Sequence, residues 1–174
     1  GRDHYESANF SQGQGYFFGA GMKLDLDGDD EHHAARYGHG ASAHYGVGLF
    51  IDRQGDDHYG SSGPFYNGGV AWDSSVSLMI DAGNGRDTYD FDHSTGLGRA
   101  DYASWGLFID DGGTDRYQAP SGFGDSSEKS VAGFFDLDGK DTYRLLPDVL
   151  ILDNVRPGNG KLFFHPQGGI FVDR

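Results

Sequence analysis

The sequence predicts an all-β fold, a right-handed parallel β-solenoid (β-helix) of about six coils of ~28 residues. A hydrophobic-Asp motif returns at nearly constant spacing, Gly and Ser recur at fixed places, and apolar residues alternate before each motif. An array or ring of β-hairpins would also be periodic. We favour the solenoid because stacked coils demand a small residue at the same position in every unit.

The repeated motif is an apolar run that ends in Asp, followed by a Gly, a second Asp and a Tyr. It is clearest in residues 50–59, Phe-Ile-Asp-Arg-Gln-Gly-Asp-Asp-His-Tyr, and His32 takes the place of the Tyr in the first unit. The anchoring residues of the five complete units are Asp25, Asp52, Asp81, Asp110 and Asp136. We therefore expect residues 1–174 to form a single repeat array.

Both ends of the sequence carry parts of this motif. Residues 1–5 match the end of a unit and residues 169–174 match the beginning of one, so we expect a fragment of a longer chain. Residues 145–161 are inserted after the last complete motif and contain Pro147 and Pro157. This insertion is expected to form a loop over one face or a local cap.

The seven residues before each anchor alternate with period two, which is typical of a strand. We expect the side chains one, three and five places before the anchor to face the core. A second short strand is expected around each Tyr, as in residues 87–91. The residue twelve places before each anchor is always Gly, which indicates a positive φ or a close backbone approach. These glycines are Gly13, Gly40, Gly69, Gly98 and Gly124.

Composition limits the partners of this chain. It carries a formal net charge of -14 and has no Cys. Such a charge repels phosphate backbones and anionic membranes, so we expect no nucleic-acid partner. No apolar run approaches the ~20 residues of a membrane span, so no membrane insertion is expected. The same charge attracts cations, and the lack of Cys excludes disulfides and thiolate metal sites.

Stacking would place equivalent Asp residues about 4.8 Å apart, where ionised carboxylates repel by about 1 kcal/mol per pair in water. Either backbone N–H groups of the Gly turn or bound Ca²⁺ must compensate. If backbone N–H groups compensate, each Asp only caps a tight turn and binds no metal. Ca²⁺ is the predicted cofactor, above all at the turns 25–30 and 136–141. The candidate ligands are Asp25, Asp27, Asp30, Asp52, Asp57, Asp81, Asp87, Asp110, Asp115, Asp136, Asp138 and Asp141.

Two resemblances concern these motifs. The turns at 83–89 (Gly-Asn-Gly-Arg-Asp-Thr-Tyr) and 112–117 resemble those of RTX-type calcium β-rolls, whose nonapeptide units are much shorter than this repeat. Residues 10–143 resemble uncharacterised bacterial proteins with tandem Gly-rich, hydrophobic-Asp-x-x-Gly-x-Asp-x-Tyr repeats, on Gln-Gly-Gln-Gly at 12–15 and Gly-Val-Gly-Leu-Phe-Ile-Asp at 46–52. This resemblance implies a secreted or cell-surface bacterial protein and implies no reaction.

One polar row varies in chemistry along the repeat. Eight places before each anchor lie His44, Asp73, Tyr102 and Glu128 in successive units. Neighbouring coils would bring these groups together as general acid and base, although an ordinary solvated face would look the same. His32 and His33, or His39 with His44, could hold a transition metal. Neither a phosphate-binding Gly-rich loop nor a nucleophile elbow occurs.

A second row suggests a partner. Phe50, Met79, Phe108 and Phe134 lie two places before their anchors, on the face that alternation puts opposite the expected core. We expect this face to be covered by the insertion at 145–161, by a second protomer or protein partner, or on both sides within one domain.

These observations favour a non-enzymatic, calcium-stabilised β-solenoid segment with a structural or adhesive role. The alternative is a carbohydrate-active enzyme or carbohydrate-binding module on a β-helix. Aromatic residues, 14% of the chain, and the varied polar row favour this alternative.

Overall fold

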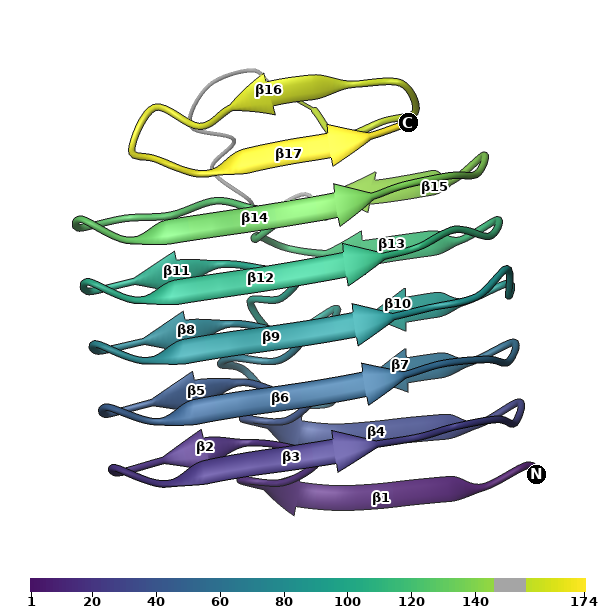
Figure 1. Cartoon of the computed structure of the whole chain (residues 1–174), viewed down its shortest axis with the longest axis horizontal. Coiled ribbons are helices and arrows are strands. Elements are labelled where there is room, and N and C mark those ends of the chain that lie inside the picture. Colours follow the sequence, from purple (N-terminus) through teal and green to yellow (C-terminus); the bar gives the residue numbers. More distant parts are fainter. Residues whose placement is uncertain (146–155) are drawn as a thin grey trace.

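The computed structural model describes residues 1–145 and 156–174 and shows an all-β, parallel β-solenoid of about five turns. Each complete coil runs through three sheets in turn, and the coils stack from the N-terminal end to the C-terminal end (Figure 1). The partial motifs at the two ends account for the sixth coil that the sequence suggested. Within the described residues there is no helix that could cross a membrane.

The strands of each sheet lie far apart in sequence and side by side in space. Sheet A contains β1 (His4–Asn9), β4 (Glu31–Arg36), β7 (His58–Gly60), β10 (Thr88–Asp90), β13 (Arg116–Ala119) and β15 (Thr142–Leu145). Sheet B contains β2 (Gly15–Tyr16), β5 (Ser42–Ala43), β8 (Ala71–Trp72) and β11 (Ala100–Asp101). Sheet C contains β3 (Ala20–Leu24), β6 (Val47–Asp52), β9 (Val76–Asp81), β12 (Trp105–Asp110), β14 (Val131–Asp136), β17 (Ile170–Asp173) and β16 (Leu162–Phe164).

The register follows the sequence repeat residue by residue. Asp52 pairs with Asp81 in sheet C, and Tyr89 pairs with Tyr117 in sheet A. Such register stacks equivalent side chains directly on one another. The prediction of a solenoid rather than an array of hairpins is confirmed, since β16 with β17 is the sole antiparallel strand pair of the described chain.

Two of the three corners of a coil use left-handed backbone. At the corner between sheets B and C, His44 and Tyr45 have φ of 55° and 61°. At the corner that enters sheet B, His39 and Gly40 have φ of 49° and 73°. The left-handed region of backbone conformation is unfavourable for residues that have a Cβ. Hydrogen bonds between coils stabilise it here, and the Tyr45 amide donates to the Asp73 carbonyl at 3.0 Å. The third corner is the Asp-Gly-Asp motif.

Two columns of stacked rings fill the interior. In sheet A, Tyr59 and Tyr117 stack on either side of Tyr89, with ring centroids 4.9 Å apart in both pairs. In sheet C, Phe108 and Phe134 stack at 5.1 Å. All of these rings are fully buried. Their near-parallel stacking is a consequence of the register, since each ring has its equivalent one strand spacing away.

The expected orientation of the sheet C strands was wrong. The residues two places before the anchors, Phe50, Met79, Phe108 and Phe134, are fully buried inside the solenoid. The residues one, three and five places before the anchors point outward. Both faces of these strands are apolar, so hydropathy alone does not reveal which face lies inside.

Small residues should have marked the inner face. Four places before the anchor, Ser77 is buried and donates a hydrogen bond to the Val70 carbonyl at 2.8 Å, because sheet B closely approaches sheet C there. Six places before it, Ser104 Oγ accepts the Ser75 amide of the preceding coil at 3.1 Å. The expected alternation placed these positions on the outer face. They lie inside, where a facing backbone is close, since a Cβ on Gly48 would lie within 3 Å of the Ala41 carbonyl oxygen.

Of the three coverings expected for this row, the structure shows burial within one domain rather than a partner surface. Other coils of the same chain cover Phe50, Met79, Phe108 and Phe134, so this row is unavailable to a partner. Of the insertion at 145–161, residues 146–155 lie outside the described residues. The described part leads into β16, which pairs with β17 at the C-terminal end of the stack (Figure 1).

We predict that Gly98→Val and Gly40→Val each destabilise the solenoid by at least about 3 kcal/mol. Both glycines have positive φ, as the sequence predicted. A Cβ on Gly40 would lie 2.7 Å from the Leu78 carbonyl oxygen, and one on Gly98 would meet the Gly133 carbonyl oxygen. Thermal unfolding should show a large loss of stability, whereas the outward Thr88→Val should change little. Equal melting of all three variants and the parent would contradict the stacking model.

Candidate metal centre

The second Asp of each motif forms a ladder between coils. The Asp57 carboxylate accepts the Asp30 amide at 2.7 Å, Asp87 accepts the Asp57 amide at 2.7 Å, and Asp115 accepts the Asp87 amide at 2.8 Å. The glycine two places earlier makes room for the carboxylate, since a Cβ on Gly55 would lie 2.7 Å from both Asp57 oxygens. One carboxylate oxygen in each turn is thus satisfied by the backbone.

The remaining oxygens are not all satisfied. Asp57 Oδ2, Asp115 Oδ2, Asp141 Oδ2 and Asp136 Oδ1 are buried and lack a hydrogen-bond partner. A buried carboxylate oxygen without a donor loses its hydration and gains nothing in return. The side of the column that holds these atoms therefore calls for a proton or a cation.

The tyrosines that follow the second Asp reach this column. Tyr89 Oη lies 2.6 Å from Asp81 Oδ2 and 2.7 Å from Asp110 Oδ2. Tyr143 Oη lies 2.8 Å from Asp136 Oδ2 and 2.5 Å from Asp173 Oδ2. A phenol has one proton and cannot donate to two carboxylates at once. At each of these tyrosines, a further proton or a cation must make up the difference.

The carboxylates gather into compact groups across neighbouring coils. In each group, every residue offers one ligand atom and these atoms lie within 4.8 Å of one another. The four groups of the described chain are Asp25, His32 and Asp52; Asp57, Asp81 and Asp87; Asp87, Asp110 and Asp115; and Asp136, Asp141 and Asp173.

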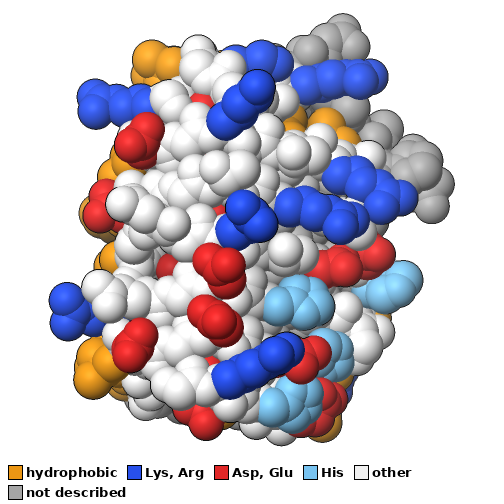
Figure 2. All heavy atoms as spheres, turned by 90° about the vertical axis from the view of Figure 1, so that its right-hand side faces the viewer, with side chains coloured by type: hydrophobic (Ala, Val, Ile, Leu, Met, Phe, Trp, Pro, Cys, Tyr) orange, Lys and Arg blue, Asp and Glu red, His pale blue; other side chains and the backbone are white. Residues whose placement is uncertain are grey.

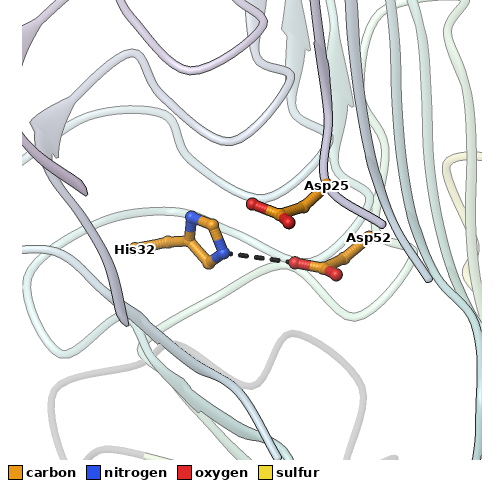
Figure 3. Close-up of side chains that lie close together, drawn as sticks. All are labelled: Asp25, His32 and Asp52. Atoms are coloured by element: carbon orange, nitrogen blue, oxygen red, sulfur yellow. Dashed lines mark ion pairs between the residues drawn. The ribbon is translucent and has the colours of Figure 1, made fainter. Parts of the chain in front are cut away.

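The first group has a cation of its own. Figure 3 shows His32 facing Asp52, with His32 Nε2 3.2 Å from Asp52 Oδ2 and Asp25 beside them. Lys23 Nζ lies 2.6 Å from His32 Nδ1 and 3.9 Å from Asp25 Oδ2, over the ring of Tyr5. Burial lowers the pKa of Lys23 to about 8, so the ammonium is still charged at neutral pH. This lysine supplies the positive charge that the first group needs.

The other three groups consist of carboxylates alone. In residues 1–145 and 156–174, no Lys, Arg or His side chain forms an ion pair with any of their members. Burial and the charge of Asp81 raise the pKa of Asp87 to about 10. Burial is also the largest cause that raises the pKa of Asp57 to about 7 and that of Asp136 to about 8. In the absence of a cation, these shifts favour the protonated form of the buried carboxyls, above all that of Asp87.

These groups fit Ca²⁺ in size and in ligand type. Ca²⁺ takes oxygen ligands at 2.3–2.6 Å, so ligands on opposite sides of the ion lie about 4.6–5.2 Å apart. The ligand atoms of each group lie within 4.8 Å of one another, close enough for all of them to contact one such ion. Three carboxylates in monodentate or bidentate contact would supply three to six of the six to eight oxygens.

The structure brings most of the predicted ligands together. The four groups include Asp25, Asp52, Asp57, Asp81, Asp87, Asp110, Asp115, Asp136 and Asp141. Asp30 is buried beside the column, where its carboxylate accepts the Asp3 amide at 2.6 Å, but it joins none of the groups. Asp27 and Asp138 are exposed and lie outside the groups. Each group combines two ligands of one motif with a third from a neighbouring coil.

Sequence reasoning missed Asp173 and Lys23, and it considered His32 only as one of a pair of histidines for a transition metal. Asp173 begins the incomplete last motif, and its place in the repeat could have revealed it. Lys23 and His32 depart from their rows in the same coil, where the other complete units have Phe or Met and Tyr. Two simultaneous departures that face each other in a solenoid are a recognisable signal of an internal ion pair.

The varied polar row lies on the outside, at the corner between sheets B and C. His44 Nδ1 lies 2.7 Å from Asp73 Oδ2, and Tyr102 and Glu128 follow in the next coils, both exposed. A surface hollow of this protein is lined by Asp56, Asn84, Arg86, Thr114 and Asp138, at the other corner of sheet C. The row is therefore not part of that hollow.

The predicted histidine pairs do not meet. His32 and His39 are buried, and burial lowers the pKa of His39 to about 3. His33 points outward, with Nδ1 3.0 Å from Glu6 Oε1, and His44 pairs with Asp73. In the described residues, no candidate metal group contains two histidines.

The fold and the site place this chain among parallel β-solenoids with a buried axial column of carboxylates. Comparison with known proteins found no matching family model, no matching curated protein and no matching solved structure.

We predict that the metal-free protein loses stability as the pH rises from 5 to 9. The folded pKa values of about 6 for Asp81, 7 for Asp57 and Asp115 and 8 for Asp136 exceed the unfolded value of about 4. A carboxyl with a raised folded pKa contributes stability below the unfolded pKa and loses it as the pH passes the folded pKa, by about 1.4 kcal/mol per pKa unit. Melting in chelator at pH 5, 7 and 9 measures this. A constant or rising melting temperature would contradict it.

Proposed function

We propose that this chain is a calcium-stabilised structural segment of a secreted or cell-surface protein. The observation that carries the proposal is the presence of three buried groups made of carboxylates alone, with unpartnered oxygens and no positive side chain beside them. The first group, where Lys23 supplies the charge, is the internal comparison. This comparison supports a cation at the equivalent carboxylate group in each of the other coils.

A bound cation would link neighbouring coils. Each group draws its ligands from two successive motifs, as with Asp57 of one motif and Asp81 and Asp87 of the next. An ion held between them would replace mutual repulsion by attraction and fasten one coil to the next. A ligand that binds only the folded state stabilises it by about 2.7 kcal/mol at a hundredfold excess over its Kd.

The setting outside the cell follows from the chemistry of such sites. Extracellular calcium modules work at Kd values of about 10⁻⁴–10⁻³ M, which suits a site that must first release its protons. The resemblance of the turns at 83–89 and 112–117 to calcium β-rolls supports the same setting. A rigid, repetitive solenoid whose stability rises where calcium is abundant suits a structural or adhesive role.

We predict that Asp87→Asn acts in opposite directions with and without calcium. Asp87 belongs to two of the groups, and its pKa of about 10 means that its burial opposes folding in the metal-free state. The amide removes that penalty, so the variant should melt higher than the parent in chelator. It should gain much less stability from millimolar Ca²⁺, because both central groups lose a charged ligand. Calorimetric melting with and without Ca²⁺ measures both effects.

The matched control is Asp138→Asn. Asp138 was a predicted ligand but is exposed and outside the groups, so this variant should keep the full gain from Ca²⁺. If Asp138→Asn loses the gain and Asp87→Asn keeps it, the ions bind in the outer turn. If the parent gains no stability from Ca²⁺ and holds none after purification, the column carries protons alone and the calcium proposal is wrong.

A second candidate function, carbohydrate binding, has its own support. Aromatic side chains are exposed over the sheet B side of the N-terminal coils. These residues are Phe10, Tyr16, Phe17, Phe18, Tyr45, Phe65 and Tyr102. Phe18 and Tyr45 stack at 5.0 Å from coil to coil, and Trp72 contacts His44 within the same surface. Exposed aromatic patches mark interaction sites, and flat rings with polar neighbours suit the apolar faces of sugar rings.

We predict that Tyr16→Ala with Trp72→Ala abolishes retention on an insoluble polysaccharide if this surface binds carbohydrate. Trp105→Ala, an exposed aromatic on sheet C, is the control and should keep retention. Sedimentation with cellulose, chitin and peptidoglycan measures bound protein. Absence of retention of the parent on all three would leave the structural role alone.

A further inference from the structure

The outer face of sheet C is apolar throughout. Outward side chains alternate with the buried ones along β3, β6, β9, β12, β14 and β17, and β16 extends the same face. No charged side chain points outward from these seven strands of the described chain. The outward residues are Ala20, Met22, Leu24, Val47, Leu49, Ile51, Val76, Leu78, Ile80, Trp105, Leu107, Ile109, Val131, Gly133, Phe135, Leu162, Phe164, Ile170 and Val172.

Sheet A provides a comparison within the same molecule. It has the same parallel strands and the same alternation, but its outward side chains are polar. They include Glu31, His58, Thr88, Arg116 and Thr142. Figure 2 shows the histidines and many charged side chains over the centre and right of the view, while the hydrophobic side chains gather mostly toward the left-hand edge, where some charged side chains also project. Solvent exposure therefore does not explain the composition of the sheet C face.

The face is large enough for a stable interface. Its seven strands, about 4.8 Å apart and three to six residues long at about 3.3 Å each, cover roughly 600 Å². Two such faces in contact would bury about 1,200 Å², at the lower limit of stable protein–protein interfaces. Several of its side chains stand well clear of the sheet, since Trp105 is 57% exposed and Met22 is 61% exposed.

We propose that the outer face of sheet C binds the same face of a second copy of this chain. The pattern of outward side chains repeats from strand to strand. A second copy related by a two-fold axis therefore presents ridges and grooves that match those of the first. The net charge of -14 lies elsewhere on the molecule, and this face is where two acidic copies can approach without opposing charges. Trp and Met are among the residues enriched in interface cores, and Trp dominates interface energetics.

The test measures the mass of the whole chain in solution. Light scattering and sedimentation should show a dimer at micromolar concentration. Val76→Lys with Trp105→Lys places two charges on paired outward positions and should raise the dimer dissociation constant at least about a hundredfold. The control, Thr88→Lys with Thr142→Lys, places two charges on outward positions of sheet A and should leave the mass unchanged.

A cross-linking experiment does not depend on the folding of the lysine variant. The chain has no Cys, so Leu107→Cys puts a single thiol on the central strand of the face. A short bifunctional maleimide should link two copies through this thiol, and should not link Thr88→Cys. A parent that is monomeric at about 100 µM, cross-linking of neither thiol, or a lysine pair that folds and still dimerises would overturn the proposal. So would a monomer that binds neutral lipid vesicles through this face.

Discussion

Coil-to-coil register is the constraint on which the rest of this structure depends. Parallel pairing sets equivalent residues of successive motifs one strand spacing apart, as with Asp52 and Asp81. Apolar and aromatic residues gain from this arrangement, because each ring finds an equivalent ring to stack on. For charged residues the arrangement is unfavourable, because each carboxylate lies next to an equivalent carboxylate that repels it. One geometric rule thus explains both the stability of the core and the electrostatic strain in the column.

Three kinds of group in the chain offset this repulsion between carboxylates. Backbone amides satisfy one oxygen of each second Asp, as Asp57 does for Asp87. Tyrosine phenols donate to the anchoring carboxylates, but Tyr89 must serve two of them. Lys23 neutralises the first group. Burial and neighbouring carboxylates raise the pKa of Asp87 and Asp110, and either shared protons or a divalent ion would offset this repulsion. These alternatives predict opposite responses to chelation and to pH.

The outside of the solenoid is divided by chemistry. Sheet A presents polar side chains, the corner between sheets B and C presents aromatic rings around the His44–Asp73 pair, and sheet C presents an apolar plane. A solenoid can carry such differences because the outward residues of each sheet vary without changing the stacked interior. The inner rows maintain the fold, while the outer rows are free to specify contacts.

The sequence by itself determined the parallel stacking, the length of the repeat, the positive φ at Gly40 and Gly98, and most of the carboxylates that meet in the column. These features follow from periodicity, since a residue type demanded in every unit reveals its environment. Only the tertiary structure decided which face of the sheet C strands lies inside. Both faces are apolar, and a pattern of period two does not say which of them is buried. It also decided that Asp27 and Asp138 point outward while Asp173, His32 and Lys23 join the column. The third ligand of each group comes from a neighbouring coil, and distances between coils are set by packing rather than by spacing along the chain.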